Sequence, residues 1–279
     1  MGTTAILPES LGKLVKQNKV PVVVLLHHGN YLHTPFWNYR KPRKCPLYTT
    51  MTQILTAEQV ESMSVDEINA AIRTAMEYDE YKWQVEKGYH IKCKERAKGL
   101  HKILYKCPVC GKEFETDSAG IHLWCNACGS KWEMDTLSRL HGVNTDKGFS
   151  HIPDWYRWER AEVEKEVRAG TYRFEDEIRI EDYYNNKVKC IEVGHGKVVH
   201  DQNGFTITGV IVGEQVVINK PVQSMYSVHV ECDFLGRGDA FDIATDKTTY
   251  FMYLKTAKNY LTKMHFATEA LYDFYTKKQ

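Results

Sequence analysis

The stretch Cys107-Pro-Val-Cys110-Gly111, followed further along by Cys125-Asn-Ala-Cys128-Gly129, decides the fold at the centre of this chain. A Cys-x-x-Cys turn brings two thiolates to one edge of a tetrahedron, and two such turns supply the four soft ligands that Zn²⁺ prefers. Glycine after each second cysteine permits a tight backbone turn. We therefore predict a four-thiolate zinc site, a zinc ribbon, whose ligands are Cys107, Cys110, Cys125 and Cys128.

The fourteen residues between Cys110 and Cys125 suit a hairpin. Phe114 is expected on its outgoing arm, Asp117 to Gly120 at its tip, and His122 and Trp124 on its return strand. His122 is interpreted as a surface histidine rather than a competing ligand. A redox dithiol is the alternative for the paired cysteines. A closed four-cysteine site has no open coordination position, so it stabilises a fold and performs no Lewis-acid chemistry.

The composition is that of an ordinary globular protein, with 43% hydrophobic and 26% charged residues. Its formal net charge of +1 gives no whole-chain reason to expect a nucleic-acid partner. The longest apolar run, Val20 to Leu26, is too short to cross a membrane, and the N-terminus has no signal-peptide pattern. We expect a cytoplasmic protein whose other cysteines are reduced bystanders, namely Cys45, Cys93, Cys190 and Cys232.

Before the cysteines, residues 9–19 predict a short amphipathic helix and residues 47–55 a strand. The apolar run Pro21 to Leu26 is typical of a strand buried on both faces of a parallel sheet. Such a strand needs neighbouring strands and covering helices, and residues 1–100 supply too few of them.

A second helix is predicted before the cysteine region. Ser64-x-x-Glu67 is a capping-box pattern, and the apolar spacing that follows predicts a helix to about Lys87, ended by Gly88.

After the cysteines, Pro153-Asp154 predicts the start of a helix that ends near Gly170. Short β-rich runs follow between Thr171 and Leu254, with turn signals such as Asn203-Gly204. Six or seven strands and a final amphipathic helix predict a small barrel of pleckstrin-homology type. A β-sandwich with an appended helix is the alternative.

Three features carry candidate chemistry. His27-His28 ends the buried strand, but no nearby carboxylate orients either imidazole, so a catalytic role is not favoured. His141 and Asp146 match a His-x4-Asp pattern, which we interpret as a chance match in a turn. A basic stretch leads into the ribbon and is interpreted as a solvated face that is able to meet lipid or nucleic-acid phosphates. Its members are Lys92, Lys94, Arg96, Lys98, Lys102 and Lys106.

Several segments resemble bacterial acyltransferases of the lysophosphatidate (1-acylglycerol-3-phosphate) family, specifically a subgroup with a zinc-ribbon insert. The resemblance covers most of the chain and is best through residue 160. It rests on Leu7-Pro-Glu-Ser-Leu-Gly-Lys-Leu-Val15, Val20-Pro-Val-Val-Val24, His28-Gly-Asn-Tyr-Leu32, Asp79-Glu-Tyr-Lys-Trp-Gln84, Ala97-Lys-Gly-Leu100 and Leu104-Tyr-Lys-Cys-Pro-Val-Cys-Gly111.

The resemblance implies transfer of an acyl group from a thioester carrier to a lysophospholipid hydroxyl. In that family a His-x4-Asp pair deprotonates the hydroxyl, an arginine block helps to bind glycerol phosphate, and a Glu-Gly-Thr-Arg block follows. Only the fourth family block, Val20 to Val24, has a counterpart here, and Glu-Gly-Thr-Arg is absent. We therefore expect an N-terminally truncated, inactive piece of such an enzyme, with no catalytic residue of its own.

The resulting expectation is an α+β multidomain chain. Residues 1–100 would be the end of an α/β acyltransferase domain, 101–140 the zinc ribbon, 141–170 a linker helix, and 171–279 the barrel with its C-terminal helix. Expected partners are an anionic lipid surface at the inner face of the membrane, an acyl carrier, or the missing acyltransferase segment. The alternative function is a non-enzymatic zinc-ribbon adaptor for protein, anionic lipid or, less favoured, nucleic acid.

Overall fold

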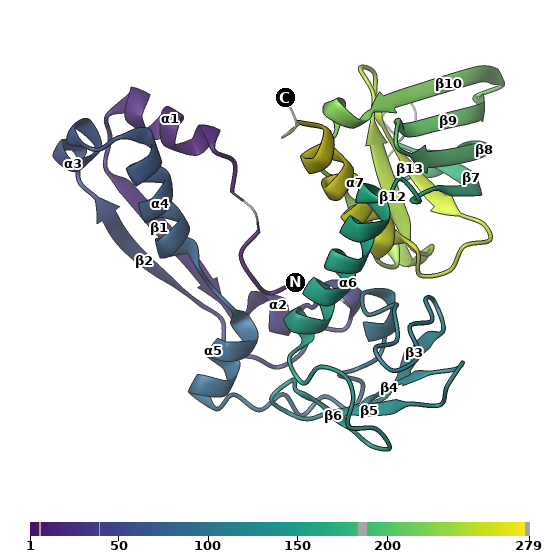
Figure 1. Cartoon of the computed structure of the whole chain (residues 1–279), viewed down its shortest axis with the longest axis horizontal. Coiled ribbons are helices and arrows are strands. Elements are labelled where there is room, and N and C mark those ends of the chain that lie inside the picture. Colours follow the sequence, from purple (N-terminus) through teal and green to yellow (C-terminus); the bar gives the residue numbers. More distant parts are fainter. Residues whose placement is uncertain (6, 39, 184–188, 277–279) are drawn as a thin grey trace.

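The computed structural model describes residues 1–5, 7–38, 40–183 and 189–276. It is an α+β structure, as predicted, and its parts are arranged around helix α6 (Ile152–Arg168) (Figure 1). A helix-covered β-hairpin comes first, a four-stranded ribbon lies in the middle of the chain, and a seven-stranded sheet with a C-terminal helix comes last.

The N-terminal hairpin pairs β1 (Val22–His28) antiparallel with β2 (Tyr48–Leu55). Three helices pack with it, namely α1 (Ser10–Asn18), α3 (Ala57–Ser62) and α4 (Val65–Met76). Their shared core is small and contains Leu55, Val60, Ile68 and Ile72. The predicted capping box is confirmed, because Ser64 and Glu67 each bond the other's backbone amide at the start of α4.

The prediction of a doubly buried parallel strand is wrong for the described residues. β1 has one antiparallel neighbour, β2, and no third strand joins this sheet in the described part of the chain. Side chains alternate across a strand, and the helices pack against one face only. Val23 and Leu25 on the other face are therefore 43% and 52% exposed.

The predicted helix ending near Lys87 is two helices. α4 stops at Met76, and α5 (Glu80–Lys87) starts after Asp79, whose side chain accepts the amides of Tyr81 and Lys82. A side-chain N-cap of this kind marks the start of a new helix. The predicted stop at Gly88 is confirmed, with a left-handed φ of 65°.

Short helical turns lie in the connecting segments: α2 (Asn30–His33) and η1 (Phe36–Asn38) lie between β1 and β2, and η2 (Leu100–Lys102) precedes the ribbon. The ribbon sheet has the order β3-β4-β5-β6, with β3 (Thr116–Ala119), β4 (His122–Cys125), β5 (Lys131–Met134) and β6 (Leu140–Gly142). One core joins the connecting segment, the ribbon and the start of α6, and it includes Leu32, Leu104, Leu123, Trp132 and Trp155.

The third part is an antiparallel sheet of seven strands, matching the predicted number. Its strands are β7 (Phe174–Asp182), β8 (Ile191–Asp201), β9 (Gly204–Ile211), β10 (Glu214–Pro221), β11 (Val230–Glu231), β12 (Ala240–Ala244) and β13 (Thr249–Leu254).

In this sheet β7, the first strand, pairs with both β8 and the last strand, β13. Helix α7 (Leu261–Thr276) packs its buried face into the same core, against residues such as Ile178, Phe241 and Met252. In the region that the structure describes, no helix is both long and apolar enough to span a bilayer.

Candidate metal centre

Two turns of the same geometry carry the four cysteines. In the first, the Cys107 amide donates to the carbonyl of Lys112, and the Gly111 amide donates to the carbonyl of Cys107. In the second, the amides of Cys125 and Gly129 make the equivalent bonds to Ser130 and Cys125.

The glycines behave as the sequence predicts. Gly111 and Gly129 have φ of 71° and 73°. This is the left-handed region in which other residues are strained. The glycines therefore let both turns close without strain, and the hairpin between them, β3-β4, brings the turns together.

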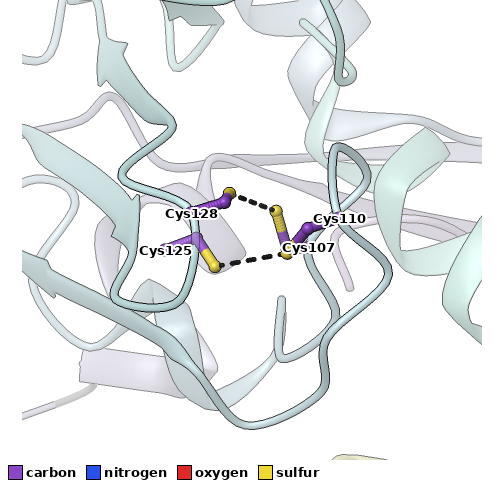
Figure 2. A group of neighbouring side chains, drawn as sticks. All are labelled: Cys107, Cys110, Cys125 and Cys128. Atoms are coloured by element: carbon purple, nitrogen blue, oxygen red, sulfur yellow. Dashed lines mark hydrogen bonds between the residues drawn. The ribbon is translucent and has the colours of Figure 1, made fainter.

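All four sulfur atoms lie within 4.8 Å of one another (Figure 2). The Cys107 and Cys128 sulfurs are 3.7 Å apart, and those of Cys110 and Cys125 are 3.8 Å apart. A tetrahedron with metal–sulfur bonds of 2.3 Å has edges of about 3.8 Å, so the spacing fits a tetrahedral metal. A disulfide needs about 2.05 Å, and all eight cysteines are free thiols.

The thiol pKa values differ between the two buried (inner) cysteines, Cys107 and Cys125, and the exposed Cys128. Cys107 and Cys125 are buried, and burial raises the pKa of both thiols, while nearby backbone amides oppose the rise. Cys128 is exposed, and the neighbouring Ser130 hydroxyl lowers its pKa to about 6. A bound divalent cation deprotonates coordinating thiols, and amides directed at the inner sulfurs stabilise the thiolate form.

Two side chains of helix α6 hydrogen-bond the backbone next to the first cysteine turn. The Trp155 indole N–H donates to the carbonyl of Lys106 at 3.0 Å, and the Lys106 amide donates to the Glu159 carboxyl at 2.7 Å. Both backbone groups of the residue before Cys107 are thus bonded to one helix. Glu159 is fully buried, and this burial raises its pKa well above the usual range of a carboxyl.

Ion pairs near the first cysteine turn join the ribbon to helices α6 and α7. The Lys263 ammonium on α7 lies 2.7 Å from Glu113 and 2.9 Å from Glu166 on α6. Lys106 contacts Glu113 at 3.5 Å and Glu162 at 3.1 Å. Lys263 is only 7% exposed, and a buried pair of this kind strongly favours one geometry because a broken pair leaves an uncompensated charge.

The remaining sequence candidates are not ligands. His122 lies on β4, as predicted, with its Nε2 atom 3.6 Å from Glu133. The tip of the hairpin is later than predicted, because Asp117 is already within β3. Among the described residues, the four cysteines form the one group of three or more His, Cys, Asp or Glu side chains that is close enough for a metal.

The His-x4-Asp match does not form a catalytic pair. His141 Nε2 lies 2.8 Å from Asp135, and Asp146 is exposed in the turn beyond β6. His28 is bonded through both ring nitrogens, to Tyr78 and to Thr50, at 3.0 Å each. Its neighbour His27 contacts Thr49.

The six basic residues before the ribbon have different surroundings in the folded chain, some bonded internally and some exposed. Arg96 donates to the carbonyls of Met134 and Cys93. Lys102 pairs with Asp239 at 2.6 Å, and Lys106 is engaged with acidic side chains as described above. Lys92, Lys94 and Lys98 are exposed. The six bases therefore do not form one continuous cationic face.

Sequence reasoning missed the residues that support the first turn. Trp155 and Glu159 lie 49 and 53 residues beyond Lys106, and no local pattern links them to it. A signal was present, because Glu159 occurs four residues after Trp155 and four before Val163, so it shares their buried helix face. A carboxyl on an apolar helix face requires a hydrogen-bonding partner.

No protein-family model, curated protein or solved structure matches the chain.

Proposed function

We propose that Cys107, Cys110, Cys125 and Cys128 bind one structural zinc ion. The observation that carries this proposal is the sulfur spacing of 3.7 and 3.8 Å, which equals the edge of a zinc–thiolate tetrahedron. Four soft thiolates in that geometry favour Zn²⁺ over hard cations. With four protein ligands the metal has no position for substrate, so its role is to hold the ribbon together.

At the level of the whole chain, we propose a zinc-stabilised part of a glycerophospholipid acyltransferase that does not itself transfer the acyl group. The resemblance of residues 7–32 and 79–111 supports the family. The side-chain contacts support the lack of catalysis, since His141 pairs with Asp135 instead of Asp146, and both nitrogens of His28 are occupied.

The C-terminal part supports a role as a binding module. Its first and last strands pair, and α7 closes the core. This arrangement favours the pleckstrin-homology-type barrel over the open sandwich. We propose that the barrel and ribbon address a partner such as an anionic lipid surface, an acyl carrier or another acyltransferase segment. The adaptor alternative for nucleic acid is weaker, because the basic stretch is split among internal acceptors and ion pairs.

A single preparation tests both parts of the proposal. Purified protein is analysed for metal content and assayed for acyl transfer to lysophosphatidate from a thioester donor. We expect about one zinc per chain and no turnover above the protein-free background. A folded, metal-free protein would refute the zinc site, and turnover that persists in highly purified protein would refute the non-catalytic role.

A further inference from the structure

A cleft of about 630 Å³ lies between the ribbon and the barrel. One wall comes from the ribbon, with Phe114, Thr116 and Asp117 before and within β3 and Asn126 in the second cysteine turn. The other wall comes from the barrel, where the segment after β13 leads into α7. The volume is in the range of small-molecule sites, which are commonly formed where two structural units meet.

The cleft has fixed walls. Lys102, which lines the cleft, pairs with Asp239 across the two units, and its carbonyl accepts a hydrogen bond from the Thr262 hydroxyl at 2.7 Å. The rings of Phe114 and Tyr260 lie 5.0 Å apart, one from each wall, and Tyr260 stacks on Phe174 of the barrel core at 3.9 Å. The cleft therefore needs no large rearrangement to receive a ligand.

The acidic groups in the cleft are already engaged. Asp239 accepts from Lys102 and from the Asp233 amide. Asp117 accepts the Ser118 amide and lies 3.4 Å from His101. Lys258 is exposed in the cleft and has no carboxylate partner among the residues that the structure describes. The two lysines and two aspartates that line the cleft balance formally, and Lys258 is the charged group among them that has no partner in the described residues.

Apolar surface lies beside this charge. Phe114, Leu254, Ala257 and Tyr260 line the cleft and are only partly buried by the barrel core. Asn126 and Asn259 add side-chain amides, which donate hydrogen bonds to anionic oxygens. The combination of an unpaired ammonium, amide donors and aromatic surface matches an anion that carries an apolar group.

We propose that this cleft binds a small organic phosphate, with the phosphate group at Lys258 and the carbon portion against Phe114, Leu254 and Tyr260. The phosphate belongs either to a soluble metabolite or to a lipid headgroup, because both present the same oxygens. The site lies on the barrel side of the ribbon and does not involve the metal-binding sulfurs.

Calorimetric titration of the full chain with phenyl phosphate tests the site, with inorganic phosphate as the probe that lacks an apolar portion. We expect phenyl phosphate to bind more tightly than inorganic phosphate. Lys258→Ala should weaken phenyl phosphate binding about tenfold, because it removes a charge-assisted contact. Lys258→Arg should retain binding. The matched control is Lys247→Ala, which removes an exposed lysine on the turn between β12 and β13 and should change nothing.

Vesicles of phosphatidylcholine with and without phosphatidate identify the source of the phosphate. Binding to phosphatidate vesicles that phenyl phosphate displaces, and that Lys258→Ala weakens, assigns a lipid headgroup. Binding of phenyl phosphate without vesicle binding assigns a soluble phosphate. The site is refuted if phenyl phosphate fails to bind at millimolar concentration, or if Lys258→Ala and Lys247→Ala bind it equally.

Discussion

The ribbon and the N-terminal hairpin are both antiparallel β structures, but they are stabilised in different ways. The ribbon strands have only three or four residues each, yet Leu123, Trp132 and Met134 are almost fully buried. The hairpin strands have seven and eight residues, yet Leu25 and Met51 are 52% and 73% exposed.

The comparison shows that the burial of side chains in a small sheet does not follow from the length of its strands. Two-stranded sheets are marginal unless another element covers them. The ribbon is covered by α6 and, under the function proposed above, is held by one metal ion at its four cysteines, whereas the hairpin depends on helices against one face. The ribbon should therefore respond strongly to loss of the metal and the hairpin should not.

The largest expected effect comes from removing a buried ligand. Cys125→Ser should abolish tight metal binding, and structural zinc contributes about 10 kcal/mol or more to the folding of small ribbons. We expect hydrogen-exchange protection to be lost across β3 to β6 and to persist in α1 and α4. Cys45→Ser, which changes a thiol outside the site, is the control. Equal loss of protection in the hairpin helices would contradict the separate stabilisation of the two sheets.

A smaller, pH-dependent effect is expected at the contact between α6 and the ribbon. Burial raises the pKa of Glu159 in the folded chain well above the ordinary glutamate value of 4.5. Its contribution to stability is then fully present below about pH 4.5 and declines as the pH rises towards the folded pKa, because the unfolded carboxyl ionises first. Glu159→Gln cannot ionise and keeps the acceptor for the Lys106 amide.

Thermal unfolding of Glu159→Gln should therefore show a gain over the parent protein at pH 7 and no gain at pH 4. The control, Glu162→Gln, should show the opposite sign, because Lys165 and Lys106 lower the pKa of Glu162 and stabilise its charged form. That contribution is present above the unfolded pKa and is lost as the pH falls. Identical pH profiles for the two variants would show that Glu159 is not held neutral by burial.

The smallest effect is expected on the exposed face of the hairpin. Leu25→Thr should change the free energy of unfolding by no more than about 0.5 kcal/mol, since the side chain is half exposed. Ile68→Ala on α4, whose side chain is fully buried, should cost about 2–5 kcal/mol. Chemical denaturation measures both. A large loss from Leu25→Thr would mean that the outer face is covered in solution.

Local patterns were predicted well and long-range partners were not. The paired cysteine turns, the Ser64 capping box and the Gly88 helix end depend on residues within five positions of one another. By contrast, His141 has Asp146 and Asp135 at almost equal distances along the chain, and only the pairing of β5 with β6 selects Asp135. The apolar run in β1 predicted a strand correctly, but it specified neither the antiparallel neighbour β2 nor the exposure of Val23 and Leu25.

By itself, the sequence determined the four cysteines that cluster, the glycines that let their turns close, and the α+β order of helices and strands, because each follows from short-range spacing. Tertiary structure alone decided that Trp155 and Glu159 support the first turn, that the basic stretch is divided, and that a cleft forms between the ribbon and the C-terminal sheet with its helix. These features depend on which surfaces meet when apolar side chains are buried, and that outcome is a property of the whole chain.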